Sequence, residues 1–108
     1  MKGTHRLNRR NVNRVTGEVS TGQYRLTRSR TGPTEYVGRS DTDLSRRLNE
    51  HLDEGYTHFR YSPAGSVKSA YEKECRQYHY RLDNGNIDNV RHPARPRGTN
   101  YRCPVCGR

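Results

Sequence analysis

The chain has 108 residues, 21 Lys and Arg against 11 Asp and Glu, and only 28% hydrophobic residues. No window approaches the roughly 20 apolar residues that a membrane span needs, and the first 20 residues lack the apolar core of a secretory signal. Leu, Ile, Val and Phe together make 15 of the 108 residues, which excludes a large core. These features predict one small, soluble, cytoplasmic domain.

The excess positive charge lies at the two ends of the chain. Residues 1–17 and 91–108 each contain five Lys or Arg and no acid, whereas residues 18–90 contain 11 residues of each sign. Of the 21 bases, 18 are Arg, whose planar guanidinium binds phosphate oxygens in pairs. We therefore expect basic ends that bind DNA, with RNA as the alternative, and a protein that can associate with the nucleoid. Tails that only confer solubility, or that bind an acidic protein, would carry the same charge.

Composition divides the chain into three parts. Residues 1–18 show no sustained hydrophobic period and predict a flexible basic arm, with a candidate edge strand at residues 11–15. Residues 19–85 have the balanced charge and the periodicity of a folded domain. Residues 86–108 contain three prolines and end in a Cys-Pro-Val-Cys-Gly run, which predicts a basic, proline-rich tail.

Three extended segments are expected. Tyr24 and Leu26 alternate with polar residues within 22–28, which is typical of a strand. The Gly32-Pro33 step predicts a turn, so a second extended run at residues 35–38 would complete a hairpin. Residues 57–61 form the third expected strand.

Two helices are expected after the hairpin. The first would run from about residue 41 to 52, with Ser40 as N-cap and Asp43 completing a capping box. The second would begin near Ser66 and continue to about Leu82, because apolar residues recur there at spacings of three and four. The elements together predict an α/β fold of the α+β type.

Both helices place charged residues on their apolar faces. Arg47 and His51 share a stripe with Leu44 and Leu48, and Glu74 shares the apolar face of the second helix. A buried Arg47–Glu74 ion pair is one explanation. The other is a cleft in which Glu74 holds a divalent metal and Arg47 stabilises charge on a phosphate.

These residues occur in the order found in the GIY-YIG nuclease superfamily, and residues 21–82 resemble it. The resemblance rests on two tripeptides, a helical Arg followed by a His one turn later, and a downstream Glu: Gly22-Gln23-Tyr24, Tyr36-Val37-Gly38 before Arg39, Arg47 with His51, and Ala70 to Glu74.

The resemblance implies a central three-stranded antiparallel sheet flanked by helices, and hydrolysis of a DNA phosphodiester by water at a single metal ion. It implies that Tyr24 is the general base or water-positioning phenol and that Tyr36 is a second phenol bonded to the water or the phosphate. Arg39 and His51 would be auxiliary residues of the site.

The resemblance also implies that Arg47 stabilises the phosphorane and that Glu74 binds Mg²⁺ or Mn²⁺. Arg46 competes with Arg47, and Glu72 with Glu74, but in each pair the second residue lies on the apolar face. The superfamily's late Asn has four candidates: Asn84, Asn86, Asn89 and Asn100.

Cys103 and Cys106 have the C-x₂-C spacing that is typical of one half of a zinc site. Cys75 and His79 lie four residues apart on the second predicted helix and would supply the other half, with His92 as the rival of His79. We expect a Zn²⁺ ion to clip the tail to this helix. The alternatives are a core position for Cys75 and free or disulfide-bonded thiols in the tail.

Overall fold

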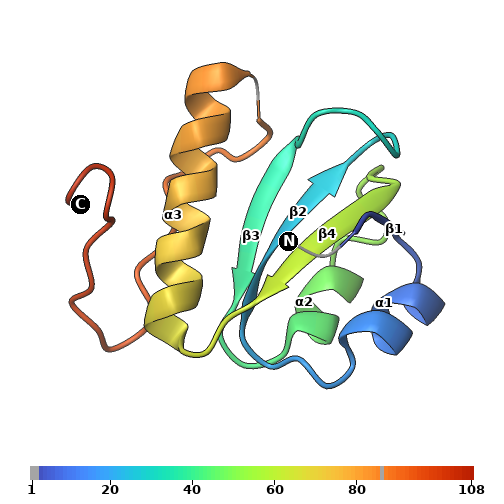
Figure 1. The fold of residues 1–108 in the computed structure, drawn as a ribbon, viewed down its shortest axis with the longest axis horizontal. Helices are drawn as coiled ribbons and strands as arrows, with labels where there is room; N and C mark the ends of the chain where they lie inside the picture. The colour runs from blue at the N-terminus through green and yellow to red at the C-terminus, as the bar shows by residue number, and fades with distance from the viewer. Residues whose placement is uncertain (1–2, 86) are drawn as a thin grey trace.

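The computed structural model describes residues 3–85 and 87–108 and shows an α+β fold (Figure 1). Four antiparallel strands lie in the order β1-β4-β2-β3. The elements in chain order are β1 His5–Arg6, α1 Arg9–Thr16, β2 Gly22–Thr27, β3 Tyr36–Ser40, α2 Leu44–Asn49, β4 His58–Pro63 and α3 Val67–Asn84. The α+β class is confirmed, and the sheet has a short fourth strand beyond the three that were expected.

The hairpin of β2 and β3 sets the register of the sheet. Tyr24 pairs with Gly38 and Leu26 with Tyr36, while on the other side of β2 Leu26 pairs with Phe59. Every residue of β2 is buried, because α1 and α2 cover one face of the sheet and α3 covers the other (Figure 1). Side chains alternate across a strand, so neighbouring residues of β2 reach two different layers.

The N-terminal residues form part of the fold, which corrects the expected flexible arm and its edge strand. The side chain of Asn8 caps α1 by accepting a hydrogen bond from the Asn11 amide at 2.8 Å. Val12 is completely buried, and the Leu7 amide donates to the carbonyl of Thr57 at 2.7 Å. The apolar residues here are too few to produce a visible period, yet they complete the core against α2 and β4.

Helix α2 is shorter than predicted. Its N-cap is Asp43, and the Ser40 hydroxyl accepts a hydrogen bond from the Asp43 amide at 2.8 Å. After Asn49 the chain continues in turns, in which the amides of His51 and Glu54 bond to carbonyls three residues back. This tighter winding keeps His51 buried on the side that the stripe predicted.

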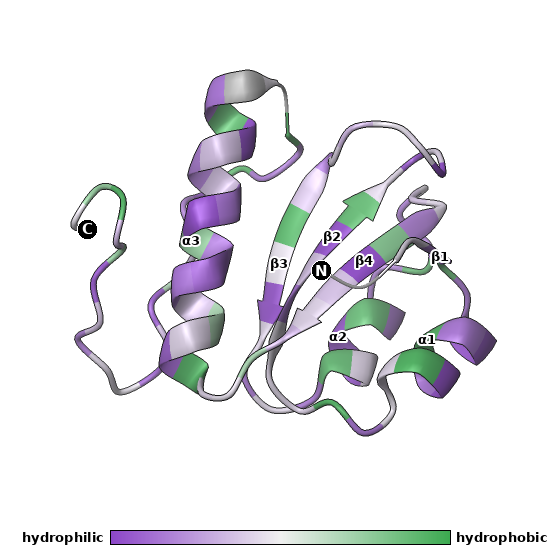
Figure 2. Cartoon of the chain, in the orientation of Figure 1, coloured by the Kyte–Doolittle hydropathy of each residue, from purple (hydrophilic) through white to green (hydrophobic). Residues whose placement is uncertain are grey.

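Helix α3 begins after its N-cap Ser66, as predicted. Figure 2 shows single hydrophobic bands among hydrophilic residues in α1, α2 and α3, and the buried residues of the larger cluster come from α1, α2, β2, β4 and the adjoining loops. The main core therefore lies between the sheet and the two short helices, and a small second cluster of Tyr71, Cys75 and Cys103 joins α3 to the tail. No helix in residues 3–85 and 87–108 is long and apolar enough to cross a membrane.

Candidate functional site

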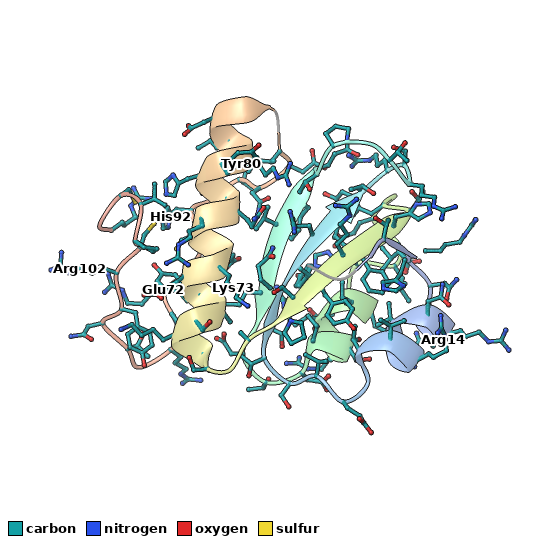
Figure 3. All side chains as sticks on the ribbon, in the orientation of Figure 1. Arg14, Glu72, Lys73, Tyr80, His92 and Arg102 are labelled. Atoms are coloured by element: carbon teal, nitrogen blue, oxygen red, sulfur yellow. The ribbon has the colours of Figure 1, made fainter. Side chains whose placement is uncertain are left out.

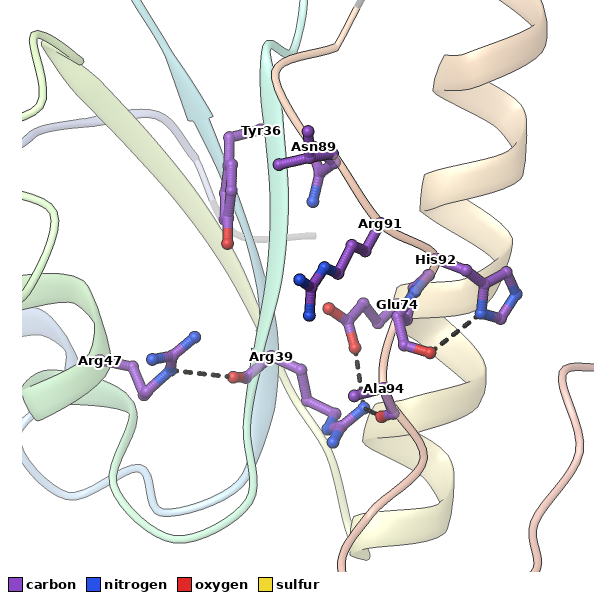
Figure 4. A pocket seen from close by; sticks show the side chains of 10 residues that line it. Tyr36, Arg39, Arg47, Glu74, Asn89, Arg91, His92 and Ala94 are labelled. Carbon is purple, nitrogen blue, oxygen red and sulfur yellow. Dashed lines mark hydrogen bonds and ion pairs between the residues drawn. The ribbon is translucent and has the colours of Figure 1, made fainter.

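A cavity of about 340 Å³ lies between β3, α3 and the segment that follows α3 (Figure 4). Four of the predicted site residues and six residues of the following segment line it: Tyr36, Arg39, Arg47, Glu74, Asn89, Val90, Arg91, His92, Pro93 and Ala94. Tyr36 and Arg47 point into it from one side, and Glu74 points into it from the other. The fold thus brings together a phenol, a guanidinium and a carboxylate from distant parts of the chain.

Tyr24 and His51 lie behind this cavity in a hydrogen-bonded chain. Tyr24 is completely buried, and its Oη lies 2.7 Å from His51 Nε2. His51 Nδ1 lies 2.6 Å from a carboxylate oxygen of Glu54. A carboxylate accepts hydrogen bonds, so Nδ1 carries the proton and Nε2 accepts from the Tyr24 hydroxyl. Burial raises the pKa of Tyr24, and the positive charge of Arg47 opposes that rise.

Gly38, the glycine of the second tripeptide, determines where the Tyr24 ring can lie. A Cβ atom on Gly38 would lie 2.2 Å from Tyr24 Cζ, so only glycine lets this phenol lie against β3. The ring centroids of Tyr24 and Tyr36 lie 6.4 Å apart, and the two ring planes are inclined by 23°. The two tyrosine rings are therefore stacked, and Tyr36 is the one that faces the cavity.

Arg47, rather than Arg46, faces the cavity. Its Nη1 lies 2.8 Å from Glu50 Oε1, and its Nε donates to the carbonyl of Arg39 at 3.4 Å. The side chain of Arg46 is 61% exposed and also pairs with Glu50. The helical stripe therefore indicated the correct arginine for this cavity.

Glu74 is buried and pairs with Arg39 rather than with Arg47. Arg39 Nη1 lies 2.8 Å from Glu74 Oε1, and both side chains are 11% exposed. Burial raises the pKa of Glu74 to about 7, although Arg39 favours the charged form. The direct Arg47–Glu74 ion pair considered from the sequence is thus replaced by an Arg39–Glu74 pair at the edge of the cavity.

Sequence reasoning missed Arg91 and Glu54 and left Asn89 among four candidates. Asn89 exchanges two hydrogen bonds with the backbone of Val37, at 2.9 and 2.8 Å, and so fixes the chain after α3 to β3. Asn86 and the side chain of Asn84 lie outside the described residues. Arg91 extends toward the centre of the cavity (Figure 4). Only Glu54 had a signal in the sequence, its spacing of three from His51.

A second cluster joins α3 to the tail. The ligand atoms of His79, His92, Cys103 and Cys106 all lie within 4.8 Å of one another, a group that can hold a metal ion. His79 Nε2 is buried and, among the described residues, has no hydrogen-bond partner. His92 Nδ1 donates to the carbonyl of Pro93 at 2.9 Å, so its Nε2 carries the lone pair that can bind a metal, and this Nε2 lies 3.4 Å from Cys106 Sγ.

Cys75 does not belong to this group, and His92 stands in its place beside His79. Burial raises the pKa of Cys75 to about 12, so it stays a neutral thiol in the small core with Tyr71. Burial also acts to raise the pKa of Cys103, but hydrogen bonds from the backbone of Cys106 and Val105 bring it to about 6. Cys103 therefore has the thiolate character of a metal ligand.

The cavity residues combine groups that bind phosphate oxygens with groups that can orient a water molecule. Comparisons with protein-family models, with curated proteins and with solved structures found no match to this chain. The chemistry of the cavity and of the His/Cys cluster is therefore the basis on which a function can be inferred.

Proposed function

We propose that the protein is a metal-dependent endonuclease that hydrolyses DNA phosphodiester bonds by attack of water. The observation that carries this proposal is the convergence of Tyr36, Arg47 and Glu74 on one cavity, with Tyr24 and His51 directly behind it. The resemblance to the GIY-YIG nucleases, which rests on these same residues, supports it.

The residues of the cavity fit a hard divalent cation. Mg²⁺ and Mn²⁺ are bound through one or two carboxylates and keep several waters, so a single buried carboxylate beside an open cavity suffices. Glu74 is the residue that would hold the ion, and the ion would polarise the phosphate oxygens. For this, Glu74 must exchange its hydrogen bond from Arg39 for the cation.

Tyr24 is the base because its own proton has an acceptor. As the phenol takes a proton from the water, its hydroxyl proton passes to His51 Nε2, 2.7 Å away. Glu54, which holds Nδ1 of the same ring, stabilises the imidazolium that forms. Tyr24 is completely buried and does not line the cavity, so this step requires Tyr36, the phenol that lines the cavity, to move aside for the water.

Arg47 stabilises the charge that develops on the phosphate. The water oxygen forms a bond to phosphorus while the ester bond on the opposite side breaks, and the leaving oxygen takes a proton from solvent. Negative charge on the equatorial oxygens is greatest in the transition state, when the new bond is partly formed and the old bond partly broken. A guanidinium held at the cavity wall by Glu50 needs little reorganisation to meet it.

The experiment that tests this proposal replaces Glu74 with Gln. Glu74→Gln keeps the shape of the side chain but loses the negative charge that holds the cation, so nicking of supercoiled plasmid in Mn²⁺ is expected to stop. DNA binding and the melting temperature are expected to change little. Glu72→Gln is the matched control, because Glu72 lies two residues away and does not line the cavity. Unchanged nicking by pure Glu74→Gln protein removes Glu74 from the mechanism.

The alternative function is a nucleic-acid-binding module of the same fold without catalysis. The Arg39–Glu74 ion pair favours it, because a purely structural pair would occupy the carboxylate permanently. This alternative predicts a gel shift and no nicked product from the wild-type protein in either Mg²⁺ or Mn²⁺.

We propose in addition that the cluster of His79, His92, Cys103 and Cys106 binds a structural Zn²⁺. Two imidazole nitrogens and two thiolates are the ligands that tetrahedral zinc prefers. Ligands at 2.0 to 2.3 Å from one ion are separated by about 4 Å or less, so small shifts would close the group around zinc. Gly107, at φ 76°, supports the turn that brings the two cysteines together.

A further inference from the structure

A second cavity, of about 280 Å³, lies under α3 on the face of the sheet opposite the main core. It is formed by two residues of β2, one of β4 and three of α3: Gln23, Arg25, Ser62, Lys73, Arg76 and Gln77. It shares no lining residue with the cavity that contains Glu74. Figure 3 shows Lys73 on the side of α3 toward the sheet and Glu72 on the side toward the tail.

The charged residues that line this cavity all have the same sign. Three of its six lining residues are cationic, and none is acidic. Arg25, on its floor, is only 7% exposed. Burial first, and then the positive charges of Arg81 and Arg60, lower the pKa of Arg25 to about 10. A cation held among other cations in a partly dehydrated cavity is stabilised by an anion.

The hydrogen-bond donors are held in place by the protein itself. Arg25 Nη1 donates to Gln77 Oε1 at 3.1 Å, and the amide N–H groups of Gln77, which also lines the cavity, are further donors. Lys73 Nζ donates to Ser62 Oγ at 3.1 Å and to the carbonyl of Pro63 at 2.9 Å. An ammonium has three N–H donors, so one remains for a ligand.

We propose that this cavity binds a backbone phosphate of the nucleic acid, at a position away from the scissile one. The inference rests on the proposed function, since it assumes that the polyanion bound at α3 is the one that is cleaved. Glu74 and Lys73 are adjacent on α3 and line different cavities, so one strand that follows this helix can meet both. The buried arginine fixes one phosphate while the catalytic residues act on another.

The test measures the affinity of a labelled DNA duplex as a function of salt, without added Mg²⁺ or Mn²⁺ so that no cleavage occurs. Lys73→Gln and Arg76→Gln are each expected to lower the log–log salt slope by about 0.9, the value for one phosphate contact in duplex DNA. Arg30→Gln, in the exposed loop between β2 and β3, removes the same charge and is expected to leave the slope unchanged. Melting curves verify that each variant folds.

An NMR titration distinguishes a phosphate in a strand from free phosphate. The Arg25 Nε–H resonance is expected to shift with the duplex and to saturate at the same concentration as the binding curve. Saturation by inorganic phosphate, with salt slopes that the cavity variants do not alter, would show a free-phosphate site and overturn the proposal. Equal slope changes in all three variants would overturn it too. If the cavity variants behave as expected but the wild type does not nick plasmid in Mn²⁺, the phosphate site stands and the nuclease proposal fails.

Discussion

The position of the Tyr24 phenol depends on Gly38, a residue with no side chain. The ring occupies the space that a Cβ at position 38 would need, and from there its hydroxyl lies within hydrogen-bond distance of His51. In turn, Glu54 sets the orientation of His51. At this scale the candidate site is a set of short, direct contacts.

Gly38→Ala is expected to lower both stability and activity. The clash is with a buried ring rather than a flexible chain end, so the cost is about 1–3 kcal/mol, as for other overpacked cores. The displaced phenol also loses its bond to His51, so nicking is expected to fall. Melting curves and plasmid nicking measure the two effects. Gly65→Ala is the control, because nothing lies within 4 Å of a Cβ there. Equal behaviour of the two variants would contradict the proposed packing.

Arg47→Ala is expected to lower the nicking rate by about two to three orders of magnitude, as removal of one transition-state donor does. Plasmid affinity is expected to change little, since the interaction is strongest in the transition state. Arg46→Ala removes an exposed charge from the same helix and is expected to retain activity. An inactive Arg46→Ala variant with an active Arg47→Ala variant would reverse the assignment.

At the scale of elements, the segment from Asn89 to Ala94 links the two candidate sites. It forms one wall of the cavity, and its His92 belongs to the His/Cys cluster. Asn89 ties it to β3, and the Ala94 carbonyl accepts a hydrogen bond from Arg39 at 2.8 Å. A metal ion in the cluster would therefore hold the cavity wall against α3.

Removal of that metal is expected to destabilise the protein and loosen the cavity. A chelator, followed by dialysis and excess Mg²⁺, is expected to lower the melting temperature by at least about 4 °C, the shift that corresponds to roughly 1 kcal/mol in a domain of this size. Hydrogen exchange at the Val37 amide, which bonds to Asn89, is expected to accelerate.

Cys106→Ser is expected to reproduce the effect of the chelator, and elemental analysis is expected to find about one zinc per chain of wild type. Cys75→Ala is the control, because it leaves all four proposed ligands intact. Full zinc occupancy in Cys106→Ser, or loss of zinc in Cys75→Ala, would contradict the assignment.

At the scale of the whole molecule, the N-terminal residues contribute both to the net charge of +10 and to the core. Leu7 and Val12 are buried in the main core, while the arginines around them are exposed. Loss of these residues therefore affects folding as well as any binding to nucleic acid.

Deletion of residues 1–17 is expected to unfold much of the domain, because burying a leucine and a valine typically contributes several kcal/mol in total. A melting curve measures this. Arg9→Gln with Arg10→Gln removes charge alone and is expected to melt like the wild type but to bind duplex DNA with a smaller salt slope. A deletion variant that melts like the wild type would show that the N-terminus does not belong to the core.

The sequence by itself determined the α+β class, the hairpin, the start of α3 and the buried faces of α2 and α3, because these follow from local periodicity and turn chemistry. It pointed to Arg47 over Arg46 for the same reason. The tertiary structure alone decided the partner of Glu74, the membership of His92 in the cluster and the fold of residues 5–16. Each of these depends on contacts between distant residues in a chain with few apolar positions. Arg39 reaches Glu74 because β3 lies beside α3, and Cys75 is a core thiol because Cys103 packs on it.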